Sequence, residues 1–361
     1  MMAAAPSATN PLADDLAHIL AHTDGSVWEA LRGQNIFITG GTGFFGRWLL
    51  ESFAHANAAL ALDARVVVLS RNPGRFQVGA RHLGSDAGIM FVRGDVQSFD
   101  ADDVRSALGK QAPERFGFVI HAATGASAKL NAENPLLMID TIVQGTRAAL
   151  EFALATEARR FLLTSSGAVY GSQPPDVTHV PEDYVGGPDQ TNVGSAYGEG
   201  KRLAELLCVC FQKQHGIEPV LARCFAFVGP FLPLDAHFAI GNFIRDALRG
   251  GPIRVGGDGT PFRSYLYAAD LAVWLWTMLV KAAPGRPFNV GSSRSLFIAE
   301  LAELVRAALG PGLQIHIGKA PVAGQPPSRY VPSTDRAAQE LGLREQIDLQ
   351  TAIQRTAHLA Q

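Results

Sequence analysis

The sequence predicts an α/β fold in which a doubly wound parallel sheet carries a smaller, discontinuous C-terminal lobe. From residue 34 onward, short β-branched and aromatic runs alternate with longer helical patterns, which indicates βαβ units. After Val228 this alternation breaks into loops rich in glycine and proline, followed by further helical patterns. A chain of 361 residues can form one large or two modest domains with a substantial core.

Hydrophobic periodicity gives the order of the elements. Strands are expected at 35–39, 65–70, 89–92, 117–121, 160–165, 218–225 and 287–290, and helices at 44–58, 135–156, 197–215 and 269–282. We therefore expect a sheet domain at 34–228, to which 263–290 returns. A substrate-binding lobe would be built from 229–262 and 291–361.

An N-terminal extension, 1–33, precedes the sheet domain. Residues 1–9 are expected to be disordered, and Asn10 and Pro11 then suit the cap and first turn of a single helix. Leu12, Leu16, Ile19 and Leu20 give that helix an apolar face. This face is expected to pack against the main body.

A glycine-rich turn follows the first expected strand, with Gly40, Gly43 and Gly46 spaced as G-x-x-G-x-x-G. Gly40 can adopt the tight turn that leaves the strand, and Gly46 lets the next helix pack close to the sheet. Gly43 lacks a Cβ, so a pyrophosphate can approach the backbone and bind the free N–H groups at the helix N-terminus. The context predicts a Rossmann-type dinucleotide site.

A tyrosine, a lysine and a serine carry the expected chemistry. Tyr197 and Lys201 are four residues apart at the start of an expected helix and share one face. A phenol with a pKa of about 10 is a poor base at neutral pH, and a nearby ammonium stabilises its phenolate. Ser166 lies where a strand ends, so it can hydrogen-bond a substrate group that exchanges its proton with the tyrosine.

Together these motifs resemble those of the extended short-chain dehydrogenases/reductases of the nucleotide-sugar epimerase/dehydratase group. The resemblance covers about residues 34–345. Its motifs are TGGTGFFG at 39–46, Gly94-Asp95-Val96, His121-Ala122-Ala123, SSGAVYG at 165–171, YGEGK at 197–201, Arg223 to Gly229-Pro230, Gly257-Asp258-Gly259 to Arg263, and Tyr267-Ala268-Ala269-Asp270-Leu271.

The resemblance implies that Tyr197 is the acid/base, that Lys201 activates it and binds the nicotinamide ribose, and that Ser166 is the proton-path partner. It also implies that a nucleotide-sugar is held by Ser166, Asn242, Phe243 and Arg263, the last a permanently charged fork suited to phosphate. The expected cofactor contacts are Gly40, Thr42, Gly43, Phe44, Phe45, Gly46, Ser70, Arg71, Asp95, Val96, His121, Ala122, Ala123, Tyr197 and Lys201.

The chain departs from the family just after the strand-end serine. Dehydratases of the group carry acidic residues there, whereas this chain has Gly167 and Ala168. Without a carboxyl pair, water elimination lacks its acid and base, which argues against a 4,6-dehydratase and weakens a sugar-acid decarboxylase. Ile142 and Ala226 replace frequent asparagines, so the substrate posture is expected to differ from that in the best-known epimerases.

The second expected strand ends in Ser70-Arg71. An NAD enzyme usually has an acidic residue there to bind the ribose 2′-OH, whereas Ser70 and Arg71 suit a 2′-phosphate. Arg71 as an ordinary loop residue is the alternative. We therefore expect NADP or NAD, with NADP slightly favoured.

These features predict an NAD(P)-dependent enzyme that transfers hydride at a carbon of a nucleotide-activated sugar, above all at C4. Such an enzyme would be a 4-epimerase or a 4-ketoreductase. The alternatives are an NDP-sugar 4,6-dehydratase or a sugar-acid decarboxylase. The intact Ser-Tyr-Lys set disfavours a non-catalytic dinucleotide-binding sensor.

Composition narrows the partners. The net charge of −2 gives no basic field for nucleic acid or an anionic membrane. The apolar run from Leu271 to Val280 is too short to span a bilayer, and the N-terminus lacks a secretory pattern, so a cytoplasmic location is expected. Cys208 and Cys210 do not share a helix face, and no metal site is expected.

A second apolar stripe on helices 135–156 and 197–215 predicts an isologous homodimer built from these helices. The residues assigned to these stripes are Leu137, Ile142, Ala149, Phe152, Leu203, Leu206, Leu207 and Phe211.

Overall fold

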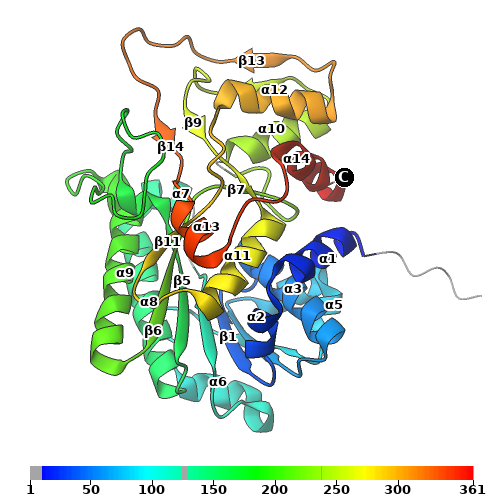
Figure 1. The fold of residues 1–361 in the computed structure, drawn as a ribbon, viewed down its shortest axis with the longest axis vertical. Helices are drawn as coiled ribbons and strands as arrows, with labels where there is room; N and C mark the ends of the chain where they lie inside the picture. The colour runs from blue at the N-terminus through cyan, green and yellow to red at the C-terminus, as the bar shows by residue number, and fades with distance from the viewer. Residues whose placement is uncertain (1–9, 124–127, 237, 361) are drawn as a thin grey trace, which may run out of the picture.

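The computed structural model describes residues 10–123, 128–236 and 238–360. The expectation of disorder over residues 1–9 lies outside this part of the chain. A parallel sheet of seven strands, in the order β11-β6-β5-β4-β1-β2-β3, forms the centre of the larger domain (Figure 1). Its strands are β1 Asn35–Thr39, β2 Arg65–Ser70, β3 Ile89–Arg93, β4 Phe118–His121, β5 Arg160–Ser166, β6 Glu218–Cys224 and β11 Pro287–Val290. The predicted doubly wound fold is confirmed.

The strands are buried on both faces, as parallel strands between two helical layers must be. Along β1, Ile36 and Ile38 pack into one apolar core and Phe37 packs into the other. The first core contains α3 Phe44–Leu60 and α11 Ala268–Lys281, and the second contains α6 Ala101–Leu108, α8 Pro135–Ala155 and α9 Ala196–His215. Because all seven strands are parallel, their carboxyl ends lie at one common edge of the sheet.

The N-terminal extension forms two helices, α1 Ala13–His22 and α2 Gly25–Ala30, where one was expected. A new helix starts because the Asp24 carboxylate accepts a hydrogen bond from the Ser26 N–H. The Tyr267 hydroxyl donates to the Asp15 carboxylate at 2.7 Å, and Arg355 also pairs with Asp15. The extension is therefore anchored to segments near the end of the chain.

The smaller lobe lies at the C-terminal edge of the sheet (Figure 1). It contains α10 Ala239–Leu248, α12 Ile298–Leu309, α14 Leu349–Ala360, and the short strands β8 Ile253–Val255, β9 Phe262–Arg263, β12 Leu296–Phe297, β13 Ile315–Ile317 and β14 Arg329–Tyr330. Strand β9 pairs with both β12 and β14, which joins segments far apart in sequence.

The remaining elements connect the lobe and sheet. Strand β10 Leu266–Tyr267 pairs with β7 Phe227–Val228, directly before α11. Helix α13 Asp335–Leu341 packs against β11 and α11, so part of the expected lobe segment 291–361 lies on the sheet domain. Around the sheet lie α4 Pro73–Gly79, α5 Arg81–Gly84 and α7 Ala128–Glu133. In the described part of the chain, no helix is both long and apolar enough to cross a membrane.

Candidate functional site

A cavity of about 1530 Å³ opens at the C-terminal edge of the central sheet, where α/β folds bind ligands. Residues from the sheet domain and from the lobe line it together. Among the predicted site residues, those that line the cavity are Gly40, Gly43, Phe44, Phe45, Ala122, Ser166, Tyr197, Lys201, Asn242, Phe243 and Arg263.

The glycine turn has the geometry of a phosphate cradle. Gly40 has a φ of +74°, and a Cβ on Gly46 would lie 2.3 Å from the Gly40 carbonyl oxygen, so both are required by the backbone. A Cβ on Gly43 would approach only that same oxygen, at 3.3 Å, so the space beside Gly43 is not needed by the protein itself. Helix α3 begins after Gly43 without a side-chain cap, which leaves its first N–H groups to a ligand. The turn fits a dinucleotide pyrophosphate.

The predicted residues that do not line the cavity are Thr42, Gly46, Ser70, Arg71, Asp95, Val96, His121 and Ala123. Thr42 and Ser70 share a hydrogen bond of 3.2 Å between their hydroxyls, which ties the glycine turn to the end of β2. Arg71 is exposed, and the exposed Asp95 carboxylate accepts a bond from the Gln97 N–H. Thr42, Ser70, Arg71 and Asp95 lie at the same C-terminal edge of the sheet as the cavity, because they follow the ends of β1, β2 and β3.

His121 is a core residue behind the cavity. Its ring nitrogens contact the hydroxyls of Thr39 at 2.7 Å and Thr146 at 3.2 Å. Burial, with the nearby Lys201 charge, lowers the pKa of His121 to about 3. The imidazole is therefore neutral at physiological pH and links β1, β4 and α8.

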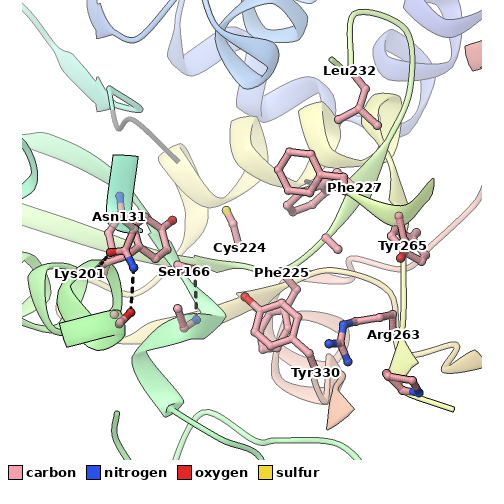
Figure 2. Close-up of a pocket in the computed structure, with 18 of the residues that line it drawn as sticks. Asn131, Ser166, Lys201, Cys224, Phe225, Phe227, Leu232, Arg263, Tyr265 and Tyr330 are labelled. Carbon is pink, nitrogen blue, oxygen red and sulfur yellow. Dashed lines mark hydrogen bonds between the residues drawn. The ribbon is translucent and has the colours of Figure 1, made fainter. Parts of the chain in front are cut away.

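Tyr197 and Lys201 lie one turn apart on α9. The Lys201 ammonium donates to the Thr164 carbonyl at 2.7 Å, and burial lowers its pKa to about 8 (Figure 2). Burial raises the pKa of Tyr197 to about 12, and hydrogen bonding by Ser166 opposes that rise. Asn131 fixes the helix start by accepting from the Tyr197 N–H at 2.9 Å.

Hydrogen bonding by Ser166 lowers the Tyr197 pKa against the larger effect of burial. The Lys201 Nζ, which the sequence predicts to stabilise the phenolate, donates to a carbonyl of β5. The role of Lys201 as activator of Tyr197 stays a prediction.

The two serines at the end of β5 differ in their partners. Ser165 donates to the Glu205 carboxylate at 2.5 Å, and Arg223 pairs with the same carboxylate at 2.7 Å. Ser166 instead accepts a bond from the Ala168 N–H at 3.2 Å, and both serines line the cavity. The Ser165 proton is held by the Glu205 carboxylate, so Ser166 is the serine better placed to meet a ligand.

The opposite end of the cavity carries Arg263. Its guanidinium donates to the Phe262 carbonyl at 2.7 Å, and burial lowers its pKa. Within the described residues, no carboxylate lies at ion-pair distance from Arg263. A half-buried cation that faces a cavity without an acidic partner is suited to a phosphate.

The other two predicted substrate residues differ in exposure. The Asn242 side-chain oxygen accepts from Arg245 at 3.1 Å, and Asn242 lines the cavity. Phe243 is 3% exposed and belongs to the apolar core of the lobe, so it contributes a wall rather than a polar contact.

Several lining residues were not predicted from the sequence, including Asn131, Cys224, Phe225, Tyr265 and Tyr330. Asn131 and Tyr330 belong to no recognised motif, and Tyr330 is brought in by the pairing of β14 with β9. Cys224 and Phe225 follow directly from the end of β6, so the strand-end argument applied to Ser166 could have found them.

Comparison with known proteins identifies the family. The model of the NAD dependent epimerase/dehydratase family matches residues 36–291. UDP-glucuronic acid decarboxylase 5 of Arabidopsis thaliana is 35% identical over 237 residues, which are 65% of this chain and 67% of that protein. UDP-glucuronic acid decarboxylase 1 of the same plant is 31% identical over 320 residues, 89% of this chain and 68% of that protein.

Solved structures show the same fold at low identity. UDP-glucose 4-epimerase of Thermotoga maritima has a TM-score of 0.75 at 22% identity, covering 90% of this chain and 98% of that one. The dTDP-glucose 4,6-dehydratase DesIV of Streptomyces venezuelae has a TM-score of 0.73 at 23% identity, covering 90% and 96%. The family model matches most of the chain, and the sequence identity to the plant decarboxylase extends over 89% of it. The chain is therefore an enzyme that belongs to the NAD dependent epimerase/dehydratase family.

Proposed function

We propose that this enzyme transfers hydride between a nicotinamide cofactor and C4 of a UDP-sugar. The observation that carries the proposal is one cavity lined by the glycine turn, by Ser166, Tyr197 and Lys201, and by the unpaired Arg263. The cradle suits a dinucleotide, the hydroxyl groups suit a sugar, and the buried cation suits a diphosphate. UDP is the nucleotide named for several relatives.

Tyr197 would remove the proton of the C4 hydroxyl while the bound nicotinamide supplies the acceptor for the C4 hydride. Ser166 would donate a hydrogen bond to the tyrosine oxygen as its negative charge develops. Lys201 would supply the positive charge that this buried site needs to form a phenolate, and its ammonium would bind the nicotinamide ribose. Reversing these steps on either face of the sugar gives reduction or epimerisation.

A neutral hexose is the substrate that the lining favours, and 4-epimerase or 4-ketoreductase is the corresponding activity. Gly167 and Ala168 put no carboxyl group after Ser166, and the cations among the lining residues are Lys201, Arg254 and Arg263. Lys201 is assigned to the tyrosine and Arg263 to the diphosphate. A C6 carboxylate would therefore have to bind Arg254, which is exposed on β8, or share a cation already in use.

UDP-glucuronic acid decarboxylase is the second candidate, and the identities of 31–35% to plant decarboxylases favour it. Oxidation at C4 would place the ketone β to the C6 carboxylate. A β-keto acid loses CO₂ once its carbonyl is polarised, so this step needs no carboxyl pair. The missing acidic residues weigh more heavily against a 4,6-dehydratase than against a decarboxylase.

The test incubates the purified protein with NAD or NADP and, separately, UDP-glucose, UDP-N-acetylglucosamine or UDP-glucuronic acid, with products identified by NMR. Epimerisation of a neutral sugar without net cofactor turnover supports the 4-epimerase. Net reduction of NAD or NADP with formation of a 4-keto sugar, the reverse of ketoreduction, supports a 4-ketoreductase. Release of CO₂ from UDP-glucuronic acid shows the decarboxylase. If no UDP-sugar exchanges hydride with the cofactor, the proposal is wrong.

Arg71 sets the expected cofactor preference. It is exposed at the end of β2, and the described residues include no carboxylate paired with it. If it binds a 2′-phosphate, Arg71→Ala should weaken NADP binding by about 1.5–3 kcal/mol and leave NAD affinity nearly unchanged. Calorimetric titration with both cofactors measures this difference. An equal change for both would show that Arg71 is a loop residue without cofactor selectivity.

We also propose that the enzyme is a homodimer. On α8 and α9, Leu137, Leu203 and Leu206 are 41%, 42% and 57% exposed, which leaves an apolar surface on adjacent helices. Four other residues that the sequence assigned to the same stripes are buried in the core instead, because they lie on the helix faces that pack on the sheet. They are Ile142, Ala149, Phe152 and Phe211.

Light scattering at micromolar concentration should give twice the monomer mass for the unmodified protein. Leu206→Glu should reduce it to the monomer mass, because a charge would be buried at the contact. Ile317→Glu, at another exposed apolar side chain remote from these helices, is the matched control. A monomeric unmodified protein would exclude the homodimer.

A further inference from the structure

Tyr330 lies in the cavity but has no part in the mechanism above. It belongs to β14, opposite Arg263 of β9, and its ring centroid is 4.7 Å from that of Phe225. Figure 2 shows Tyr330 between Ser166 and Arg263. The residue thus reaches the end of β5 from a distant part of the chain.

The Tyr330 hydroxyl fills the space where a side chain after Ser166 would be. A Cβ on Gly167 would lie 2.8 Å from the Tyr330 hydroxyl oxygen and 2.7 Å from ring carbons of Phe225. Position 167 is therefore restricted to glycine by these two rings. A phenol therefore stands beside Ser166, where Gly167 and Ala168 take the place of acidic side chains.

Ser166 lies beside Tyr330, because the Tyr330 hydroxyl fills the Cβ space of the next residue, Gly167. The effect of Ser166 also opposes the larger rise that burial causes in the pKa of Tyr197 and of Tyr330. A serine hydroxyl offers one donor and two acceptor positions. The Ala168 N–H occupies one acceptor position at 3.2 Å. One donor and one acceptor remain for the two phenols.

The charge on Tyr197 decides how these two positions are used. A phenolate can only accept, so Ser166 must direct its single proton at Tyr197 when Tyr197 is the base. The remaining acceptor position of Ser166 then requires a donor, and Tyr330 is the phenol in reach. A donor on the far side of a hydroxyl polarises it and strengthens the bond it makes.

We propose that Tyr330 is a positioning residue that orients Ser166 in a chain Tyr330→Ser166→Tyr197 and thereby stabilises the Tyr197 phenolate. This inference rests on the proposed role of Tyr197. In the oxidation step the C4 hydroxyl proton passes to Tyr197 and the C4 hydride to the cofactor. Tyr330 and Ser166 keep their own protons.

The test uses Tyr330→Phe, which keeps the ring packed on Phe225 and removes only the hydroxyl. In the NAD-loaded protein labelled with ¹³C at the tyrosine ζ-carbon, the signal missing from Tyr197→Phe identifies Tyr197. At a fixed alkaline pH at which the protein stays folded, the phenolate fraction read from this signal should fall roughly tenfold in Tyr330→Phe, because the Tyr197 midpoint moves upward. The pH profile of hydride transfer should move in the same direction with KM nearly unchanged. A midpoint and profile that both stay in place overturn the proposal.

Two further variants exclude a merely structural effect. Tyr184→Phe removes another partly buried hydroxyl outside the cavity and should leave the Tyr197 midpoint unchanged. In a Ser166→Ala background, Tyr330→Phe should add no further shift, because its effect passes through Ser166. If the shifts caused by Ser166→Ala and by Tyr330→Phe were fully additive, the hydrogen-bond chain Tyr330→Ser166→Tyr197 would be contradicted.

The titration needs no sugar, so its outcome is separate from that of the proposed function. A shifted midpoint with no hydride transfer to any UDP-sugar supports the orientation of Ser166 and rejects the proposed reaction. Hydride transfer with an unshifted midpoint rejects the role of Tyr330 and retains the reaction.

Discussion

Tyr197→Phe should slow hydride transfer by about 10²–10⁴-fold, the usual cost of losing a positioned acid/base group. The change keeps the ring and removes only the ionisable oxygen, so the fold and the cofactor affinity should be retained. The loss should appear in kcat rather than in KM, because the proton is transferred in the transition state. Single-turnover measurement of nicotinamide absorbance with a UDP-sugar that is turned over gives the rate.

The pH profile adds a second readout. Burial raises the Tyr197 pKa to about 12 and lowers that of Lys201 to about 8, so the phenolate fraction grows with pH while the ammonium that stabilises it is lost above about pH 8. The oxidation rate of the unmodified enzyme should therefore rise with pH up to about 8, and Tyr197→Phe should lose this dependence. Ser166→Ala should be milder, since water can replace part of a hydroxyl's proton path. Transfer by Tyr197→Phe at the unmodified rate would assign the acid/base role to another residue.

Gly43→Val should abolish dinucleotide binding. The φ and ψ of Gly43, −86° and −175°, are those of an extended residue, which valine adopts without strain. The new side chain would meet only the Gly40 carbonyl closely and would otherwise occupy the space beside the uncapped N-terminus of α3. The protein should fold while the pyrophosphate is excluded.

Calorimetry with NAD and NADP measures the loss, and circular dichroism verifies the fold. Gly312→Val is the matched control, because Gly312 lies in an exposed turn outside the cavity, where a Cβ would have no atom within 4 Å. Gly46→Ala should behave differently and destabilise the protein, since its Cβ would lie 2.3 Å from backbone atoms. A folded Gly43→Val protein with unchanged cofactor affinity would disprove the phosphate cradle.

The order of the seven strands of the central sheet, its four main helices and the family were predicted from the sequence alone. Local information sufficed for the sheet, because strands that alternate with helices form a parallel sheet. It also sufficed for two motifs, because the glycine turn lies within one strand-turn-helix unit and the Tyr-x-x-x-Lys pair lies within one helix. Gly46 shows this directly, since the backbone of Gly40 and Gly41 already requires it, whereas a Cβ on Gly40 would meet Ala122 and Ala123 after the neighbouring strand β4.

Tertiary structure alone decided which polar groups meet at the site. Tyr330 reaches Ser166 only because β14 pairs with β9, and Ser165 is removed from the cavity chemistry by Glu205 and Arg223, from α9 and β6. The direction of the Lys201 ammonium toward the Thr164 carbonyl was equally unforeseeable. Such contacts join residues far apart in the chain, and no local periodicity encodes which hydroxyl of a strand end is left for a ligand.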